Sequence, residues 1–412
     1  MRALSSTAMN RLAVLAAAPH RIFFFVGATQ GVAAIAWWLA DLAGRYGGWY
    51  ASPAWTVPAP WAHAYLFLYG LFPSFIFGFL LTAMPNWVNV APRRQRCVLA
   101  AALLGSGLLL LYVGLATTAW LAVAGLGVHL AGWMLALLEL LRLLRLATSG
   151  NLAFPRFVVA LLAMGWFGAA TLPATLAFDA DWAWDIGKRG VWFFLLPLFF
   201  AISHRMVPFF SSRVLSGYVV WRPAWVLWLV VAGSFAHGAL EIAGAWRWLW
   251  LVDAPLAVVV LRAAIKWGLV RCFAARLLAV LHLSLVGLAV ALALYAAQSA
   301  TLAATGIAIL GTGPLHAMTI GYFSAMAVAM VSRVSLGHSG NALVADRWTW
   351  AAFWGLLLTA VVRVVAEVAR AAPALWPPLI LASGLLFLVF FGLWAARYLP
   401  AYVRPRTDGR PG

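Results

Sequence analysis

Eight histidines are the residues of this 412-residue chain whose chemistry and spacing most need an explanation. His316 and His338 stand near the two ends of one apolar stretch, GPLHAMTIGYFSAMAVAMVSRVSLGHSG. If that stretch is helical, the residues from one histidine to the other span about 33 Å, which is the thickness of a bilayer core. The two side chains therefore belong to two different sites, on opposite sides of a membrane.

The remaining histidines can be sorted by the same two sides. His63 opens an apolar stretch on the side of His316, while two others fall on the side of His338. The outer histidines are then His63 and His316, and the inner histidines are His20, His204 and His338. Three more lie within apolar stretches, where each could hydrogen-bond a neighbouring helix: His129, His237 and His282. His237 has Glu241 one helical turn away, and Asp253 is a further intramembrane acid; such residues are candidates for function.

Each group of histidines could bind a metal. Neutral imidazole is the commonest metal ligand among side chains, and two histidines from different helices can hold a haem iron from both faces. Copper accepts imidazole and, as Cu(I), thioether, and Met318 follows His316 closely. The candidate metal ligands are His63, His204, His316, His338 and Met318. The simpler alternative is that the histidines are amphipathic residues at helix ends and that the methionine packs in the core.

Arginines accompany the inner histidines. Arg21 and Arg205 directly follow His20 and His204, and Arg333 precedes His338 in RVSLGHSG. Guanidinium groups on one face could bind an anion such as a haem propionate or a phosphate. Alternatively, these arginines only mark the cytoplasmic ends of helices.

The composition shows which elements must position these side chains. Hydrophobic residues make up 65% of the chain, and charged residues only 9%, against about a quarter in soluble proteins. We therefore expect an all-α, polytopic membrane helix bundle, forming one integral domain over 1–412. A lead-in (1–21) and a tail (398–412) would be cytoplasmic. A span needs about 20 apolar residues, which predicts about twelve transmembrane helices, near 22–43, 62–85, 97–115, 118–141, 157–178, 188–209, 224–242, 246–266, 276–296, 313–332, 349–370 and 377–397.

The distribution of positive charge supports this count. When loops are assigned alternately to two sides, one side holds only six of the 28 Lys and Arg residues, and the other holds the remaining 22. That bias favours an even number of spans with both termini cytoplasmic. The basic residues are scattered between apolar runs, so the net charge of +18 does not indicate a nucleic-acid partner. There is no CxxCH motif, which excludes a covalently attached c-type haem.

Four motifs together resemble the NnrS family of bacterial membrane proteins. They are HRIFFFVGA near the start, WAHAYLFLYG leading into FIFGFLLTAMPNW, SHRMVPFF, and the GPLHAMTIGYF stretch that ends in SLGHSG. The resemblance implies a multi-pass protein of the bacterial inner membrane that carries non-covalent haem b and copper. It also implies a role in nitric oxide metabolism, denitrification or tolerance of nitrosative stress. Where many members open the second span with W-H-A-H-E, this chain reads WAHAY, so the copper site would have fewer ligands here.

Two other functions remain open from the residues. Twelve spans with both ends inside also suit a secondary transporter without haem, which would have paired half-repeats and buried charges near the midplane. A terminal oxidase would need several closely spaced histidines within adjacent spans, and the sequence lacks them. Whether the protein catalyses a reaction is not indicated, and neither is its electron-transfer partner, which could be a quinone. The expected partners are the lipid bilayer and nitric oxide or a related small molecule.

Overall fold

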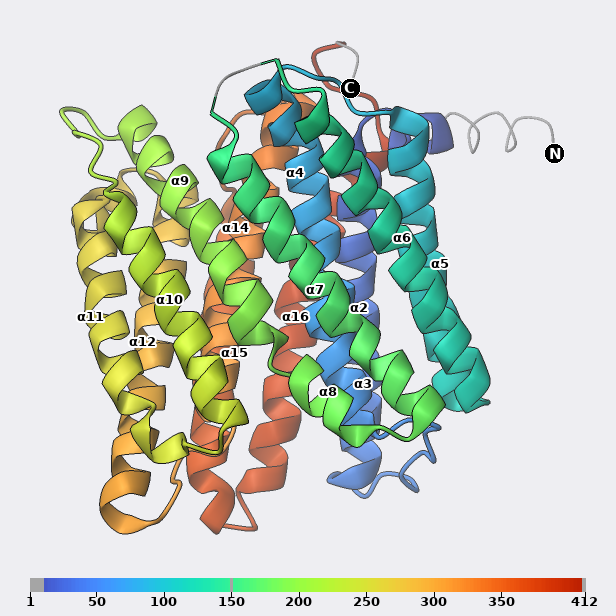
Figure 1. Cartoon of the computed structure of the whole chain (residues 1–412), viewed down its shortest axis with the longest axis vertical. Coiled ribbons are helices and arrows are strands. Elements are labelled where there is room, and N and C mark those ends of the chain that lie inside the picture. The colour runs from blue at the N-terminus through green and yellow to red at the C-terminus, as the bar shows by residue number, and fades with distance from the viewer. Residues whose placement is uncertain (1–10, 149–150, 410–412) are drawn as a thin grey trace.

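The computed structural model describes residues 11–148 and 151–409, and over these residues the chain is helical, with no strand (Figure 1). Twelve long helical segments follow one another through the chain. They are α2 (Pro19–Arg45), α3–η1–α4 (Ala59–Val88), α5 (Arg94–Ala116), α6 (Ala119–Arg145), α7 (Ala153–Phe178), α8–η2–α9 (Asp181–Val214), α10 (Ala224–Ile242), α11 (Trp250–Lys266), α12 (Arg276–Thr305), α13–η5–α14 (Gly313–Ser339), α15 (Arg347–Val368) and α16 (Trp376–Val403).

Eleven of the segments are long and apolar enough to cross a membrane. The twelfth, α11, has 17 residues and corresponds to the stretch expected at 246–266; a short 3₁₀ turn, η3 (Trp246–Trp248), precedes it. The all-helical membrane fold is therefore confirmed. α2 already begins at Pro19 and α16 continues to Val403, so the helices reach into the expected lead-in and tail. Residues 1–10 and 410–412 of those two segments lie outside the described residues.

The first and last helices meet at one end of the bundle. The Arg21 guanidinium donates hydrogen bonds through Nη1 to the backbone oxygens of Arg404, at 2.8 Å, and of Ala401, at 3.3 Å. A chain that starts and finishes on one side crosses an even number of times, as twelve spans require. That this side is the cytoplasm remains a prediction from the charge distribution.

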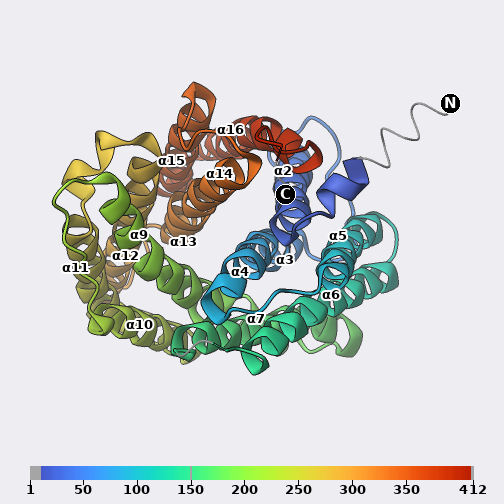
Figure 2. The same cartoon turned by 90° about the horizontal axis from the view of Figure 1, so that it is seen from above.

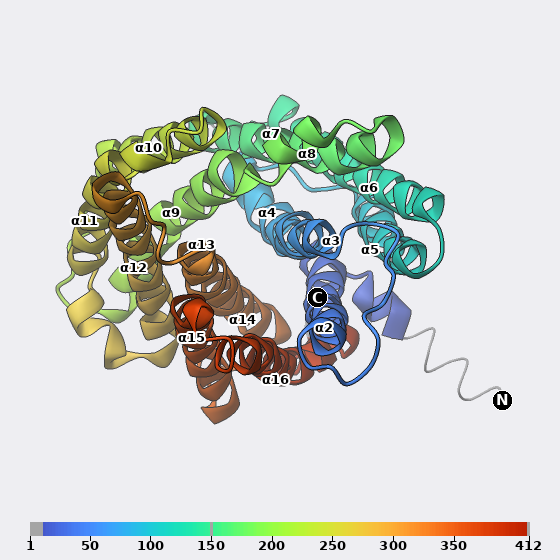
Figure 3. The same ribbon diagram turned by 90° about the horizontal axis from the view of Figure 1, so that it is seen from below.

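The helices form a closed ring with three segments inside it. Seen from above and from below, α4 (Phe72–Val88), α9 (Leu196–Val214) and α14 (Ala325–Ser339) lie on the inner side, and α2 packs against α16 to close the ring (Figures 2 and 3). The buried share of the second, sixth and tenth segments is 83%, 78% and 78%, against 67% or less elsewhere. The ring therefore faces lipid while these three segments build the interior.

Each inner segment contains a stretch of π-helix, and the three stretches occur every fourth span. They are η1 (Leu66–Leu71), η2 (Val191–Leu195) and η5 (Thr319–Ser324). The π-helix begins three residues after His63 in the second segment and three after His316 in the tenth, whereas the sixth has Lys188 at that position. The chain is thus organised as three four-helix units. π-helical turns occur mostly at functional sites.

Close helix packing in the first unit depends on glycine. A Cβ at Gly107 on α5 would lie 2.3 Å from the backbone of His129 on α6, and one at Gly125 would lie 2.5 Å from Leu111. Helices in membranes approach closely through such small residues. This contact fixes α6, and with it His129, against α5.

Asp346 joins α15 to α16 at the end of the bundle where the chain terminates. Oδ1 accepts a hydrogen bond from the Thr349 N–H at 2.8 Å, which caps α15, and Oδ2 accepts one from Arg397 Nε at 2.6 Å. Although partial burial acts in the opposite direction, these partners hold the pKa of Asp346 below its ordinary value. The stabilisation by the carboxylate is therefore present at neutral pH and is lost as the pH falls through the lowered pKa.

We expect Asp346→Ala to lower the free energy of unfolding by about 1 kcal/mol, the usual cost of losing an N-cap. The measurement is the melting temperature in detergent at pH 7. Asp346→Asn keeps a capping oxygen and loses only the ion pair, so its loss should be smaller. Equal melting temperatures for wild type and Asp346→Ala at pH 7 would contradict the assignment.

Candidate metal centre

The two outer histidines come together from different units of the fold. His63 lies on α3 (Ala59–Tyr65) and His316 on α13 (Gly313–Met318), each just ahead of a π-helix. Their ring centroids are 6.5 Å apart and their planes differ by 17°. Trp38 of α2 stacks on the other face of the His63 ring, with centroids 4.2 Å apart. Three helices therefore hold the outer pair, His63 and His316: α3 and α13 carry the two rings, and α2 packs Trp38 against one of them.

One member of the outer pair is oriented by the backbone. His316 donates from Nδ1 to the carbonyl of Thr312 at 2.9 Å, so its Nε2 is free to bind a metal. Ligating histidines usually donate their second N–H in this way, which fixes the ring. The Nδ1 atom of His63 is buried and has no hydrogen-bond partner, as expected of a nitrogen reserved for another ligand.

A charged pair stands behind the outer histidines. Arg363 and Glu367 on α15 form an ion pair of 2.6 Å, and both contact the Thr312 hydroxyl, at 3.1 and 3.0 Å. The two residues are one helical turn apart, so their charges can neutralise each other within α15. Their link through Thr312 to His316 depends on the packing of α13 against α15, which the sequence does not show.

The inner pair is His20 and His338. The rings come from the first turn of α2 and the last turn of α14, with centroids 4.6 Å apart and planes inclined by 42°. His20 is 3% exposed, and its Nδ1 is buried without a partner. Phe24, one turn further along α2, packs at the edge of His20. Each pair therefore contains one buried imidazole nitrogen without a hydrogen-bond partner among the described residues, and that nitrogen could bind a metal.

The two pairs differ in the metal geometry that they fit. Two imidazoles bonded at about 2.0–2.1 Å on opposite faces of a metal hold their ring centres roughly 6 Å apart, whereas adjacent tetrahedral positions bring them to roughly 5 Å. By its spacing the outer pair would hold one iron between its two rings, and the inner pair would supply two neighbouring ligands to a metal. Within the described residues, no three His, Cys, Asp or Glu side chains gather as a metal site. A haem needs only axial ligands from the protein, so the outer pair suits haem.

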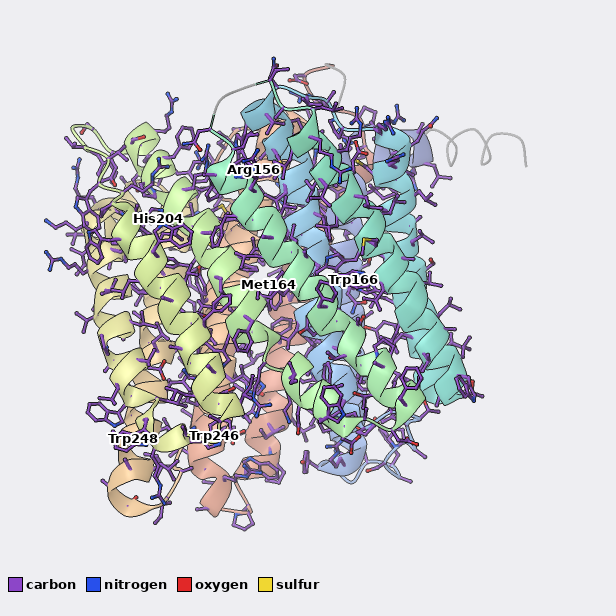
Figure 4. The ribbon with its side chains drawn as sticks, viewed as in Figure 1. Arg156, Met164, Trp166, His204, Trp246 and Trp248 are labelled. Carbon is purple, nitrogen blue, oxygen red and sulfur yellow. The ribbon has the colours of Figure 1, made fainter. Side chains whose placement is uncertain are left out.

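His204 does not join the inner pair. Its Nε2 donates to the Pro223 carbonyl at 3.1 Å, and its ring packs against Trp267 and Phe200. Figure 4 shows His204 on α9 toward the end where both termini lie, with Trp246 and Trp248 at the opposite end. His204 therefore lies at the same end of the bundle as the termini, but the predicted inner group of three histidines divides into a pair and a single residue.

The other residues predicted to bind a cofactor already pack against or bond to other parts of the protein. Met318 is fully buried in the core. The Arg205 guanidinium lies over Trp87 and Phe154, at 4.7 Å from each ring centre, and Arg333 lies 4.0 Å over Phe210. Only Arg21 is next to a histidine pair, and it is bonded to the carbonyls at the end of α16. A role for Met318, Arg205 and Arg333 in cofactor binding remains a prediction.

An apolar cavity lies at middle depth between the two pairs. It measures about 40 Å³ and is lined by Phe24, Phe75, Ile76, Phe79, Phe199, Ile202, Met326, Ala327, Met330 and Val331. On the helix that carries both His316 and His338, Met326 and Met330 are each roughly 12–15 Å from the nearer histidine. A cavity without polar partners stays dry even when it is large enough for water. It therefore favours a small uncharged guest.

The three histidines that lie within spans form hydrogen bonds with neighbouring helices, as predicted. His129 Nδ1 and Nε2 lie 3.2 and 3.1 Å from the carbonyl oxygens of Leu104 and Tyr69. His282 Nε2 lies 3.1 Å from the hydroxyl of Ser211. His237 bonds both Asp253 and Glu241. The first two fasten helices together, whereas the third belongs to a charged cluster.

Comparisons with known proteins agree with the all-helical membrane fold. A family model described as NnrS protein matches residues 14–406. A solved cryo-EM structure described as a heme-copper terminal oxidase dimer matches with a TM-score of 0.66 and 12% sequence identity, over 98% of this chain and 86% of the oxidase chain. At that identity the likeness shows a shared fold. No curated protein matches the chain in sequence.

Proposed function

The chain belongs to the NnrS family, and from that premise we propose that it is a haem protein that binds nitric oxide. It would act in nitric oxide metabolism or in tolerance of nitrosative stress, in the inner membrane of a bacterium. His63 and His316 would hold the haem iron. Ferrous haem binds this small neutral gas, and the chain supplies ligands, orientation and a water-free approach.

The observation that carries the proposal is the outer pair. Two imidazoles from different units oppose each other with ring centres 6.5 Å apart. One ring is fixed by the Thr312 carbonyl, and the other has a buried nitrogen without a partner. His316 is therefore the firmly held ligand. His63, whose ring stacks on Trp38, would be the second ligand.

The apolar cavity supports the identity of the small molecule. Its lining contains no charged or hydrogen-bonding side chain, and it lies among α2, α4, α9 and α14. A diatomic gas that dissolves in lipid loses nothing by entering such a space, whereas an ion would lose its hydration. The same argument disfavours a transporter of charged solutes through this region, and the three-unit organisation differs from the paired halves of transporters.

For copper we propose the inner pair. Two neighbouring imidazoles at the spacing of His20 and His338 offer a partial ligand set of the kind that copper accepts. The remaining positions would have to be filled by other donors, since no third His, Cys, Asp or Glu within the described part of the chain joins them.

The reduced-minus-oxidised absorption spectrum of the purified protein, before and after nitric oxide is added, tests the proposal. A b-type haem spectrum that shifts with nitric oxide supports it. A folded protein purified without haem, and unable to take up added haem, overturns it. In that case Glu241 and Asp253 would be the residues to test in a transporter.

The cavity gives a further prediction. Ala327 is 5% exposed and contributes to the cavity wall. Ala327→Leu should fill the space and slow nitric oxide binding by roughly tenfold, because each 1.4 kcal/mol added to an entry barrier costs that factor. The rate is measured after photolysis of the nitrosyl complex. Ala327→Ser hardly changes the volume and should leave the rate near that of wild type; equal rates for Ala327→Leu and wild type would show that the gas enters elsewhere.

A further inference from the structure

A second cluster of ionisable side chains lies apart from both histidine pairs, where α10 ends and α11 begins. His237 on α10 has its Nδ1 2.8 Å from Oδ1 of Asp253 on α11, and its Nε2 3.3 Å from Oε1 of Glu241. His237 and Asp253 are completely buried. Glu241 continues the chain to Arg189, whose Nε is 3.6 Å from Oε2. Imidazole thus lies between two carboxyl groups.

The cluster lies beside the segment of the second unit that corresponds to the two outer histidine positions. In the first and third units a histidine stands three residues before the π-helix, and these two histidines form the outer pair. In the second unit Lys188 and Arg189 stand there, and Trp192 of η2 packs onto His237. The position that carries a histidine in two units therefore carries a basic residue in the other, and Arg189 and Trp192 beside it contact the acid–imidazole–acid cluster.

The two contacts of the ring determine how many protons the cluster holds. A carboxylate only accepts hydrogen bonds, and a neutral imidazole carries one N–H. With both nitrogens facing carboxyl oxygens, neutral imidazole between two carboxylates would leave a nitrogen lone pair against an anionic oxygen. The contacts are both satisfied only if the ring carries two protons or if one carboxyl is protonated. Either way the cluster holds one proton more than a neutral imidazole with two carboxylates would hold.

The surroundings favour that extra proton. Arg189 and an imidazolium together balance the charges of Glu241 and Asp253, as a buried cluster requires. The Trp192 ring stacks on His237 with centroids 3.4 Å apart, which stabilises a cation. The Tyr295 ring of α12 covers the edge of His237, with centroids 4.9 Å apart. Asp253 Oδ2 is buried without a partner.

We propose that Asp253, His237 and Glu241 form a proton-binding site that exchanges its proton through Glu241. The side chains of Glu241 and Arg189 are 11% and 16% exposed, whereas those of His237 and Asp253 are not exposed at all. Glu241 lies in the last turn of α10, directly before η3 in the chain, and Figure 4 shows Trp246 and Trp248 of η3 at the end of the bundle opposite to His204. The ligand is the proton itself, and the site is independent of haem and copper. Because the ring lies between the acids and separates them, the cluster is unsuited to a metal ion.

Nitrogen NMR of the full-length protein in lipid bilayers, with isotope-labelled histidine, tests the proposal. At pH about 7.5 an isolated histidine is mostly neutral. We expect one histidine with both nitrogens protonated, absent from His237→Gln and converted to a singly protonated ring in Glu241→Gln and Asp253→Asn. A singly protonated His237 together with an infrared band of a protonated carboxyl that Asp253→Asn or Glu241→Gln removes also supports the site. A singly protonated ring without that band overturns it.

A control variant and an exchange measurement complete the test. His129→Gln is the matched control, because His129 is equally buried but faces two neutral carbonyls; it should leave the doubly protonated signal unchanged. After transfer into deuterated buffer, exchange at the His237 ring should slow in Glu241→Gln relative to wild type. Equal exchange in both would contradict the route through Glu241. Because no step uses haem, failure here leaves the nitric oxide proposal standing.

Discussion

Replacing His316 by alanine is expected to remove the bis-histidine haem spectrum and most of the haem that survives purification. His316 is the outer ligand whose ring is fixed by the Thr312 carbonyl, 2.9 Å from Nδ1. Changes to groups that merely orient a ligand cost about 10–100-fold in metal affinity, and loss of the ligand itself should cost at least as much. His63→Ala should also abolish the bis-histidine spectrum, since under the proposal both residues would hold one iron, but it should retain more haem.

The measurement is haem content per protein, by the pyridine haemochrome assay, together with the low-temperature spectrum of each variant. His129→Ala is the control, because His129 is buried within the same bundle and bonds only backbone carbonyls. Unaltered spectra in both outer variants would eliminate the outer pair as ligands. Different iron signals lost in the two variants would assign the histidines to separate sites.

Much of the architecture could be predicted because it follows from hydropathy and charge. The stretch expected at 313–332 lies in the helical segment Gly313–Ser339, which has His316 and His338 near its ends. Among the twelve segments of the described residues, only α11, with 17 residues, is too short to be counted as a membrane span. Depth in the membrane is also predictable, since it depends on the number of residues and the helical rise. Depth alone therefore groups His63 with His316, and His20 with His338.

Position around the ring could not be predicted, because it depends on contacts between distant segments. His204 has the correct depth but contacts Trp267 and Pro223 in place of His20. The link from His316 through Thr312 to Arg363 crosses from α13 to α15. The π-helical stretches leave no hydropathy signature, yet they show that the chain repeats every four spans. The three units do not resemble one another in sequence clearly enough for the repeat to be predicted. The likeness of fold to a heme-copper terminal oxidase is likewise not apparent in the sequence, since the two chains are only 12% identical.

The division of the inner group leads to the second large effect that we expect. His20 and His338 approach to 4.6 Å between ring centres, whereas the contacts of His204 are with aromatic rings and a carbonyl. His20→Ala and His338→Ala should therefore each abolish copper binding and leave the haem of the outer pair in place. His204→Ala should retain copper, because that ring contributes only packing and one hydrogen bond.

Copper bound per chain, measured by mass spectrometry after reconstitution and removal of free metal, distinguishes these variants. The haem spectrum of the same samples serves as an internal control, because the outer pair lies on the far side of the bilayer. Loss of copper in His204→Ala as complete as in His338→Ala would restore the site of three inner histidines and require α9 to move toward α2. Retention of copper in all three variants would place the metal away from the inner face. If haem is lost together with copper in His20→Ala and His338→Ala, the inner pair holds a haem, and the separation of the two metals between the two pairs is wrong.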